Sequence, residues 1–330
     1  MIPKLSNHAT PWLKMGLNAK EVNPIPSMIS DDEVLYLRWL AQEWYTGAGQ
    51  IVDAGPLLGG STVSLASGLL GNSRVHEKKK RLHSYDLFKY FSDFTDRALV
   101  KENLNDGDSV LPIFLANTSK YREMIEVYPG DIQHHFWNNK PIEILFIDCA
   151  KSWEINNHIT REFFGSLTPG RSIVVHQDYF HYACPWIHIQ MEFFSKYFSV
   201  VHAPLGGSLG FLLTDEIPAN MFSVDLFELY VESMTAMMDR AAQPFQGLWK
   251  LLVYIAKAEL LVQKRAYGSA AAVLRQVRRS PDWDDLLEWD VDQVEQELRH
   301  PHLKRVANYY RTGGLKLLAR AAVSSLTKNR

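Results

Sequence analysis

The sequence predicts an α/β fold: a mostly parallel sheet of seven strands with a terminal antiparallel hairpin, followed by a C-terminal helical extension. From residue 50 to about residue 200, short β-rich runs alternate with longer helical stretches, which is typical of a parallel sheet. The last two β-rich runs are separated only by a short turn with two glycines, so these strands must be antiparallel. After about residue 221 the β signals stop and only helical patterns follow.

The elements follow in chain order. A Pro- and Asn-rich arm precedes a helix over 31–45, whose acidic first residues complement the helix dipole. Residues 142–148 (IEILFID) are apolar apart from Glu143 and the final Asp, as in a central strand of a parallel sheet. The other strands are predicted within 50–55, 81–88, 123–132, 172–179, 198–204 and 208–215, and the helices between and after them over 59–70, 154–167, 185–198, 226–243, 248–266 and 269–279.

This pattern divides the chain into three parts. Residues 1–44 are an arm and a helix, 45–221 the α/β domain and 222–330 a helical domain. Within the α/β domain, residues 89–124 form a long insertion between the second and third strands. Long ordered excursions are usually functional, so this insertion is predicted to be lid-like, or to bind an acceptor.

Composition narrows the class of protein. The chain has 330 residues, of which 35 are Lys or Arg and 37 Asp or Glu, so a net charge of −2 gives no reason to expect nucleic acid. No apolar run approaches the ~20 residues that cross a bilayer, and the N-terminus does not resemble a secretory signal. Two cysteines are too few for a disulfide framework. These features predict a cytoplasmic protein.

The tail from Pro301 carries seven basic residues and no acidic ones. It is a candidate for contact with an anionic membrane surface or a protein partner. The alternative is a solvated basic face on a packing helix. Self-association of the chain is left open.

A glycine-rich turn joins the first strand to the following helix. In residues 51–62 (IVDAGPLLGGST), the strand ends near Asp53 and the helix begins near Gly60. Gly55 and Gly59 lack the Cβ atoms that would keep a ligand from the backbone. Backbone N–H groups at such a helix start favour an anionic or polar ligand.

Acidic residues end five successive strands of the predicted sheet. Ligands of open α/β sheets bind at the carboxyl ends of the strands, so these acids are expected at one edge. The acid about 30 residues after the glycines is placed to accept hydrogen bonds from both hydroxyls of a ribose. The five residues are Asp53, Asp86, Asp131, Asp148 and Asp178.

The order of VDAG-x-x-x-GGST, SYDLF, GD, LFID and LTPGRSIVVHQDY resembles a class I S-adenosylmethionine-dependent methyltransferase. It is most similar to the macrocin O-methyltransferase and cephalosporin-hydroxylase-like group, over roughly residues 45–217. The resemblance implies a Rossmann-like sheet and S-adenosylmethionine as cofactor. Cofactor-binding residues are then Asp53, Gly55, Gly59, Gly60 and Ser61 (turn and methionine part), Asp86 (ribose), Asp131 and Ile132 (adenine), and Asp148.

The resemblance also implies a catalytic centre, and here the chain departs from the family. Relatives carry D-G-x-H after the fourth strand, whereas this chain has Asp148 followed by Lys151 at the position of the base. Two acids after the fifth strand are replaced by Gln177 and Asp178. Asp148, Gln177 and Asp178 remain candidate ligands for Mg²⁺, which accepts oxygen ligands and retains water.

Four side chains are candidates for the catalytic base. Lys151 would need a depressed pKa to take a proton, and would otherwise act as a cation that stabilises an alkoxide or pairs with Asp148. His176 shares the side of Asp178 by strand alternation. His181 lies in the loop where an acceptor should enter, and His188 follows nearby.

The resulting prediction is an O-methyltransferase, with a hydroxyl of a sugar or glycosylated metabolite as acceptor. A scaffold that has lost catalysis is the first alternative, because Ala150, Lys151 and Gln177 stand at catalytic positions of the family. An NAD-dependent oxidoreductase is a weaker alternative, since its glycines are spaced G-x-G-x-x-G rather than as in Gly55-x-x-x-Gly59-Gly60.

Overall fold

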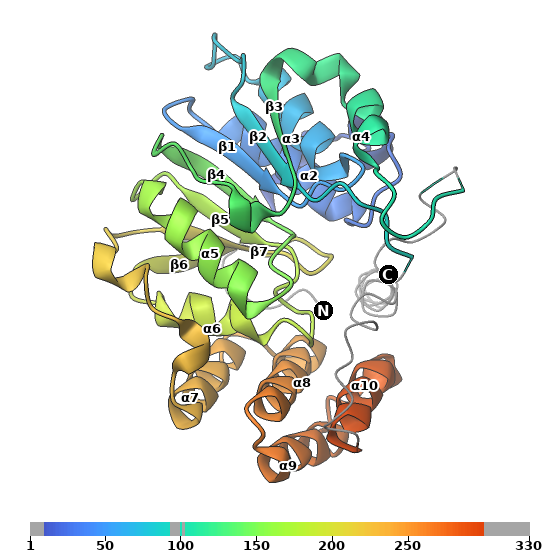
Figure 1. The fold of residues 1–330 in the computed structure, drawn as a ribbon, viewed down its shortest axis with the longest axis vertical. Helices are drawn as coiled ribbons and strands as arrows, with labels where there is room; N and C mark the ends of the chain where they lie inside the picture. The colour runs from blue at the N-terminus through green and yellow to red at the C-terminus, as the bar shows by residue number, and fades with distance from the viewer. Residues whose placement is uncertain (1–9, 93–99, 101–102, 300–330) are drawn as a thin grey trace.

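The computed structural model describes residues 10–92, 100 and 103–299. They form a seven-stranded sheet of order β3-β2-β1-β4-β5-β7-β6 (Figure 1). Strands β3, β2, β1, β4 and β5 pair in parallel, and β7 is antiparallel to β5 and β6. The predicted fold class is therefore confirmed, including the terminal hairpin. The strands are β1 (Gln50–Ala54), β2 (Leu82–Asp86), β3 (Ile125–Pro129), β4 (Ile142–Ile147), β5 (Ile173–His176), β6 (Phe198–His202) and β7 (Leu209–Leu213).

Helices cover both faces of the sheet, and a further group follows it (Figure 1). The helix predicted over 31–45 begins at a Ser30–Glu33 capping box and continues as a π-helical turn, Leu40–Trp44. The α-helices are α1 (Ala19–Val22), α2 (Asp31–Trp39), α3 (Gly60–Gly71), α4 (Leu111–Asn117), α5 (Trp153–Phe163), α6 (Pro185–Phe193), α7 (Val231–Ala242), α8 (Gly247–Gln263), α9 (Tyr267–Arg278) and α10 (Glu288–Arg299).

The central strands are buried on both faces because their side chains alternate between two hydrophobic clusters. One cluster includes α5 and α6, and the other includes α2 and α3. This explains why apolar residues occupy both faces of these strands. Val52, Leu145, Ile147 and Val174 belong to the first cluster, and Ile51, Ile144, Phe146 and Val175 to the second.

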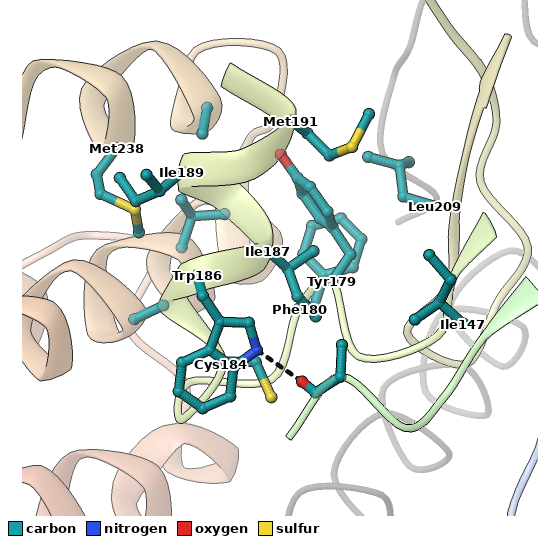
Figure 2. Packing of buried hydrophobic residues seen from close by; sticks show 14 of the residues in the cluster. Ile147, Tyr179, Phe180, Cys184, Trp186, Ile187, Ile189, Met191, Leu209 and Met238 are labelled. Atoms are coloured by element: carbon teal, nitrogen blue, oxygen red, sulfur yellow. Dashed lines mark hydrogen bonds between the residues drawn. The ribbon is translucent and has the colours of Figure 1, made fainter. Parts of the chain in front are cut away.

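The helical extension is continuous with the core of the sheet. Helices α7 and α8 pack against α6, and α8 packs against α9 and α10. Figure 2 shows Met238 of α7 beside Ile189 of α6, within the cluster that reaches the sheet at Ile147. Among the described residues, no helix is both long and apolar enough to span a bilayer. The basic tail from Pro301 lies outside the described residues.

Two carboxyl groups are buried in the described part of this extension. Glu259 of α8 is 5% exposed and Asp290 of α10 is 2% exposed. Burial, reinforced by the nearby Glu297 carboxyl, raises the pKa of Glu259 to about 8. Burial alone raises the pKa of Asp290 to about 7. Both groups therefore favour the protonated form in the folded protein.

We expect Glu259→Gln to stabilise the protein in alkaline buffer. The pKa of Glu259 rises from 4.5 to about 8 on folding, so the unfolded chain binds fewer protons between these values and wild-type stability falls as pH rises through this window. The variant should gain about 1–3 kcal/mol near pH 8 and almost nothing near pH 4. Denaturant unfolding at both pH values, with the exposed Glu216→Gln as control, measures this. Equal gains at both pH values would contradict it.

Candidate active site

The register of the sheet brings the ends of three strands together. Ala54, the last residue of β1, pairs with Tyr85 of β2 and Ile147 of β4. Asp86 and Asp148 are the residues that follow these partners, so both acids lie beside the turn that leaves β1. Each is close enough to affect the pKa of the other acids at this edge. The predicted glycine-rich turn therefore opens onto an acidic edge.

Two glycines of the turn are required by contacts within the chain. Gly55 has a φ of +110°, and a Cβ there would lie 2.8 Å from the carbonyl carbon of Asp148. A Cβ on Gly60 would collide with the side chain of Ser27, which comes from the N-terminal arm. The backbone of Asp148 and the side chain of Ser27 leave no room for a side chain at these two positions, and the predicted cofactor contacts of Gly55 and Gly60 stay predictions.

Asp53 anchors the start of α3. Its carboxylate accepts hydrogen bonds from Ser61 Oγ (2.9 Å) and Thr62 Oγ1 (2.5 Å). Burial raises its pKa to about 7, and the two hydroxyls oppose that rise. Gly59 caps this helix in the left-handed conformation, without a side-chain acceptor for the first N–H groups. The start of α3 thus keeps the electrostatic preference of a helix N-terminus for negative charge.

Asp86 holds the turn from the side of β2. It accepts hydrogen bonds from the backbone N–H of Leu57 at 2.9 Å and of Phe88 at 2.5 Å, one on each oxygen. Burial raises the pKa of Asp86, against the effect of these two donors. Each carboxylate oxygen has two lone pairs, so one on each remains for a hydroxyl. The next side chain, Leu87, is 48% exposed and offers an apolar surface beside the acid.

The turn after β3 lies next to Asp86. The N–H of Gly130 donates to the carbonyl of Asp86 at 2.9 Å. Asp131 caps the following turn by accepting from the N–H of Gln133 at 2.9 Å. Ile132 is 6% exposed and packs in the cluster that contains Tyr85. Their assignment to an adenine ring stays a prediction.

Lys151 joins the acids that follow β4 and β5. Its Nζ donates to Asp148 Oδ1 at 3.0 Å and also bonds Asp178. In the orientation that satisfies its hydrogen bonds, the Gln177 amide nitrogen donates to Asp178 Oδ1 at 2.7 Å and to Asp148 Oδ1 at 3.3 Å. Burial raises the pKa of Asp148 to about 7, Lys151 lowers it and Asp178 raises it. We call these four residues the lysine–carboxylate cluster.

The cluster does not fit the predicted magnesium ligands. The Lys151 ammonium lies between the two carboxylates, and Gln177 presents its N–H₂ group rather than its carbonyl oxygen. In the part of the chain that the structure describes, no group of three His, Cys, Asp or Glu residues could hold a metal ion. Nothing in this geometry supports Mg²⁺ binding.

The three histidines near this edge differ in their exposure to solvent. His176 and His188 are both 0% exposed, and burial lowers the pKa of each to about 3. Rings that stay neutral inside the core are poor candidates for a base. His181 is partly exposed, and its pKa is lowered by burial, raised by Asp178 and lowered by Lys151. It is therefore the histidine beside the cluster.

Helix α6 and the helical extension support the two loops that carry the cluster. Trp186 Nε1 of α6 donates to the carbonyl of Ala150 at 2.6 Å, the hydrogen bond drawn in Figure 2. Trp153 Nε1 donates to Gln263 Oε1 of α8 at 2.8 Å. In the loop after β5, the ring of Phe180 lies 4.6 Å from that of Trp249. The extension therefore positions Lys151 and Asp178 through aromatic side chains.

Sequence reasoning missed two contacts and one backbone conformation that shape the turn. Ser27 packs on Gly60, and Leu57 adopts a φ of +47°. Asn117, at the end of α4, donates to the carbonyl of Leu58 at 2.9 Å. Residues 111–124 of the predicted insertion thus contact and support the turn. Residues 93–99 and 101–102 of that insertion lie outside the described residues. No sequence motif marks any of these contacts.

A second concave surface lies between α8 and α9, with a volume of about 590 Å³. Lys250, Arg275 and Arg279 line it together with Asp282. This groove is formed by the helical extension, not by the sheet edge. It lacks the paired buried acids of that edge, which remains the better candidate for chemistry.

Comparison with known proteins identifies no family. No protein-family model matches the chain, and no curated protein matches it. Among solved structures, the calicheamicin methyltransferase CalS11 has a TM-score of 0.42 and 15% identity, over 56% of this chain and 79% of that one. Its apo structure, described as a TDP-rhamnose 3'-O-methyltransferase of calicheamicin biosynthesis, has a TM-score of 0.41 and 16% identity, again over 56% of this chain and 79% of that one. A candidate RNA methyltransferase, PH1948 of Pyrococcus horikoshii, has a TM-score of 0.35 and 14% identity, over 57% of this chain and 85% of that one. At these values the likeness adds nothing to the fold described above.

Proposed function

We propose that this protein is an S-adenosylmethionine-dependent O-methyltransferase. One observation supports the proposal: the turn at the start of α3, the acid Asp86 and the lysine–carboxylate cluster lie at one edge of the sheet. The motif order supports the same family. S-adenosylmethionine would supply an electrophilic methyl group on a sulfonium.

The residues of the edge fit this cofactor. The N-terminus of α3 favours the carboxylate of its methionine part, because the first N–H groups of a helix lack internal partners. Asp86 retains lone pairs for the two ribose hydroxyls. Leu87, exposed beside Asp86, offers an apolar surface to the adenine ring of the cofactor. The negative charge at the edge favours a cationic sulfonium.

The lysine–carboxylate cluster would activate the acceptor hydroxyl. Methylation forms an O–CH₃ bond and requires the hydroxyl to lose its proton. Asp148, whose pKa is about 7, can take that proton near neutral pH, since a base works best when its pKa is close to the working pH. Lys151, beside the same carboxylate, would stabilise negative charge on the acceptor oxygen.

The acceptor class follows from the family resemblance alone. Relatives of the macrocin O-methyltransferase group mostly modify sugars or natural products, so we propose a hydroxyl of a sugar or glycosylated metabolite. A protein that binds the cofactor without turnover is the alternative, because the residues at catalytic positions depart from the family.

Methyl transfer to a panel of nucleotide sugars and glycosides tests this proposal. Purified protein is incubated with labelled S-adenosylmethionine, and label is measured in the acceptor fraction. Transfer that Asp148→Asn reduces at least tenfold would support the proposal. Cofactor binding without transfer to any acceptor would favour the scaffold, and no binding would contradict both.

A further inference from the structure

The geometry points to a resident cation at this edge: we infer that the ammonium of Lys151 takes the place of a divalent metal ion. The two carboxylates that a metal would bridge, Asp148 and Asp178, are instead bridged by Nζ. The inference concerns the same edge as the proposed function but does not depend on methyl transfer.

Charge and space both favour a single cation between Asp148 and Asp178, either the Lys151 ammonium or a metal ion. Mg²⁺ binds oxygen at about 2.0–2.1 Å in near-octahedral geometry, so an ion held by both carboxylates would lie close to the position of Nζ. Nζ already lies 3.0 Å from Asp148 Oδ1. Two cations on one carboxylate pair would repel at this short distance. Metal binding would therefore require Lys151 to leave.

The surroundings of Asp148 and Asp178 also favour the Lys151 ammonium over a metal ion. Gln177 directs its amide N–H₂ at both carboxylates, which suits acceptors already facing a cation and does not offer a metal a third oxygen. The side chains of Lys151, Asp148 and Asp178 are only 23%, 22% and 11% exposed. An ion pair this enclosed is held by its surroundings rather than by solvent-exposed rotamers.

The loop that carries Lys151 is fixed on both sides. Its own N–H donates to the carbonyl of Cys149 at 2.8 Å, and Trp186 binds the carbonyl of Ala150. Ser152 then caps α5 by accepting from the N–H of Ile155. The backbone thus presents Lys151 toward the carboxylates as a built feature of the fold.

Binding of Mn²⁺, measured by electron paramagnetic resonance on the full-length protein, tests the inference. Wild type should show only weak binding. Lys151→Ala should bind Mn²⁺ at least tenfold more tightly, because it leaves two carboxylates and room for water, a set that suits this ion. Adding Asp178→Asn to that variant should abolish the gain, and Lys151→Arg, which keeps the charge, should behave like wild type.

Stability supplies an independent readout. Mn²⁺ should raise the thermal unfolding midpoint of Lys151→Ala and leave that of wild type unchanged, because a ligand stabilises only the state that binds it. Tight Mn²⁺ binding by wild type would overturn the inference without the need for any variant. Equal binding by wild type and Lys151→Ala would also overturn it. Neither result depends on methyl transfer, so failure here leaves the proposed function to be judged separately.

Discussion

Lys151→Met is expected to lower the free energy of unfolding by about 2–4 kcal/mol near pH 8, because it leaves two enclosed carboxylates without their cation. The loss should shrink as pH falls. Lys151 holds down the pKa of Asp148, so without the lysine that pKa rises further, and the variant departs from wild type as pH rises through the folded pKa. Below the folded pKa of about 7, Asp148 is protonated with or without the lysine, so the part of the difference that comes from Asp148 should nearly vanish.

Denaturant unfolding across this pH range measures the effect. The exposed Lys79 provides a matched control, since Lys79→Met removes the same charge from the surface. Combining Lys151→Met with Asp148→Asn should recover part of the loss, because one uncompensated carboxylate is removed. A loss no larger than that of the surface control would show that the ion pairs contribute little.

Asp86→Asn is expected to weaken S-adenosylhomocysteine binding about tenfold to hundredfold, the range for losing a charged hydrogen-bond acceptor. The substitution keeps the shape of the side chain but places an N–H₂ group against a backbone N–H that now donates to the acid. The ribose and the turn would both lose an acceptor. Equilibrium titration of both proteins gives the ratio of dissociation constants.

Asp215→Asn, in an exposed position after β7, is the control for the Asp86 variant. It should bind S-adenosylhomocysteine as wild type does. Circular dichroism should show that the Asp86 variant is folded before its affinity is compared. Unchanged affinity in the folded variant would remove Asp86 from the cofactor site.

The fold was predictable because its signals are local. Central strands such as Ile142–Ile147 are apolar at all but one position, Glu143, as expected for a sheet covered on both faces. The glycine turn between β6 and β7 fixed the direction of the last strand. The sequence did not predict α1 in the N-terminal arm, α4 in the insertion or the π-helical turn at Leu40–Trp44, and β5 ends at His176, before the acid that was predicted to close it.

The candidate site was predictable in position but not in contacts. Acids at strand ends follow from topology, so Asp86 and Asp148 could be placed beside the turn. Whether an oxygen faces a ligand or a neighbour depends on long-range packing. Asp53 binds the hydroxyls at the start of α3, and Gly60 accommodates Ser27, neither of which a strand pattern reveals.

Lys151 shows the same limit most clearly. The sequence placed it three residues after Asp148, as a candidate base or as a cation paired with that acid. Its contact with Asp178 joins residues 27 positions apart and depends on the loops that α6 and α8 support. The role of the helical extension was equally hidden, because its contacts run through aromatic rings such as Phe180 and Trp249.

Calorimetric titration with S-adenosylhomocysteine tests the central claim most directly, run once in Mg²⁺ buffer and once in a chelator. The account predicts micromolar binding with the same dissociation constant and heat in both, because the cofactor residues and the resident ammonium need no metal. Absence of binding in both buffers would contradict the proposed cofactor site. Binding that requires Mg²⁺ would contradict the resident cation and restore Asp148 and Asp178 as metal ligands.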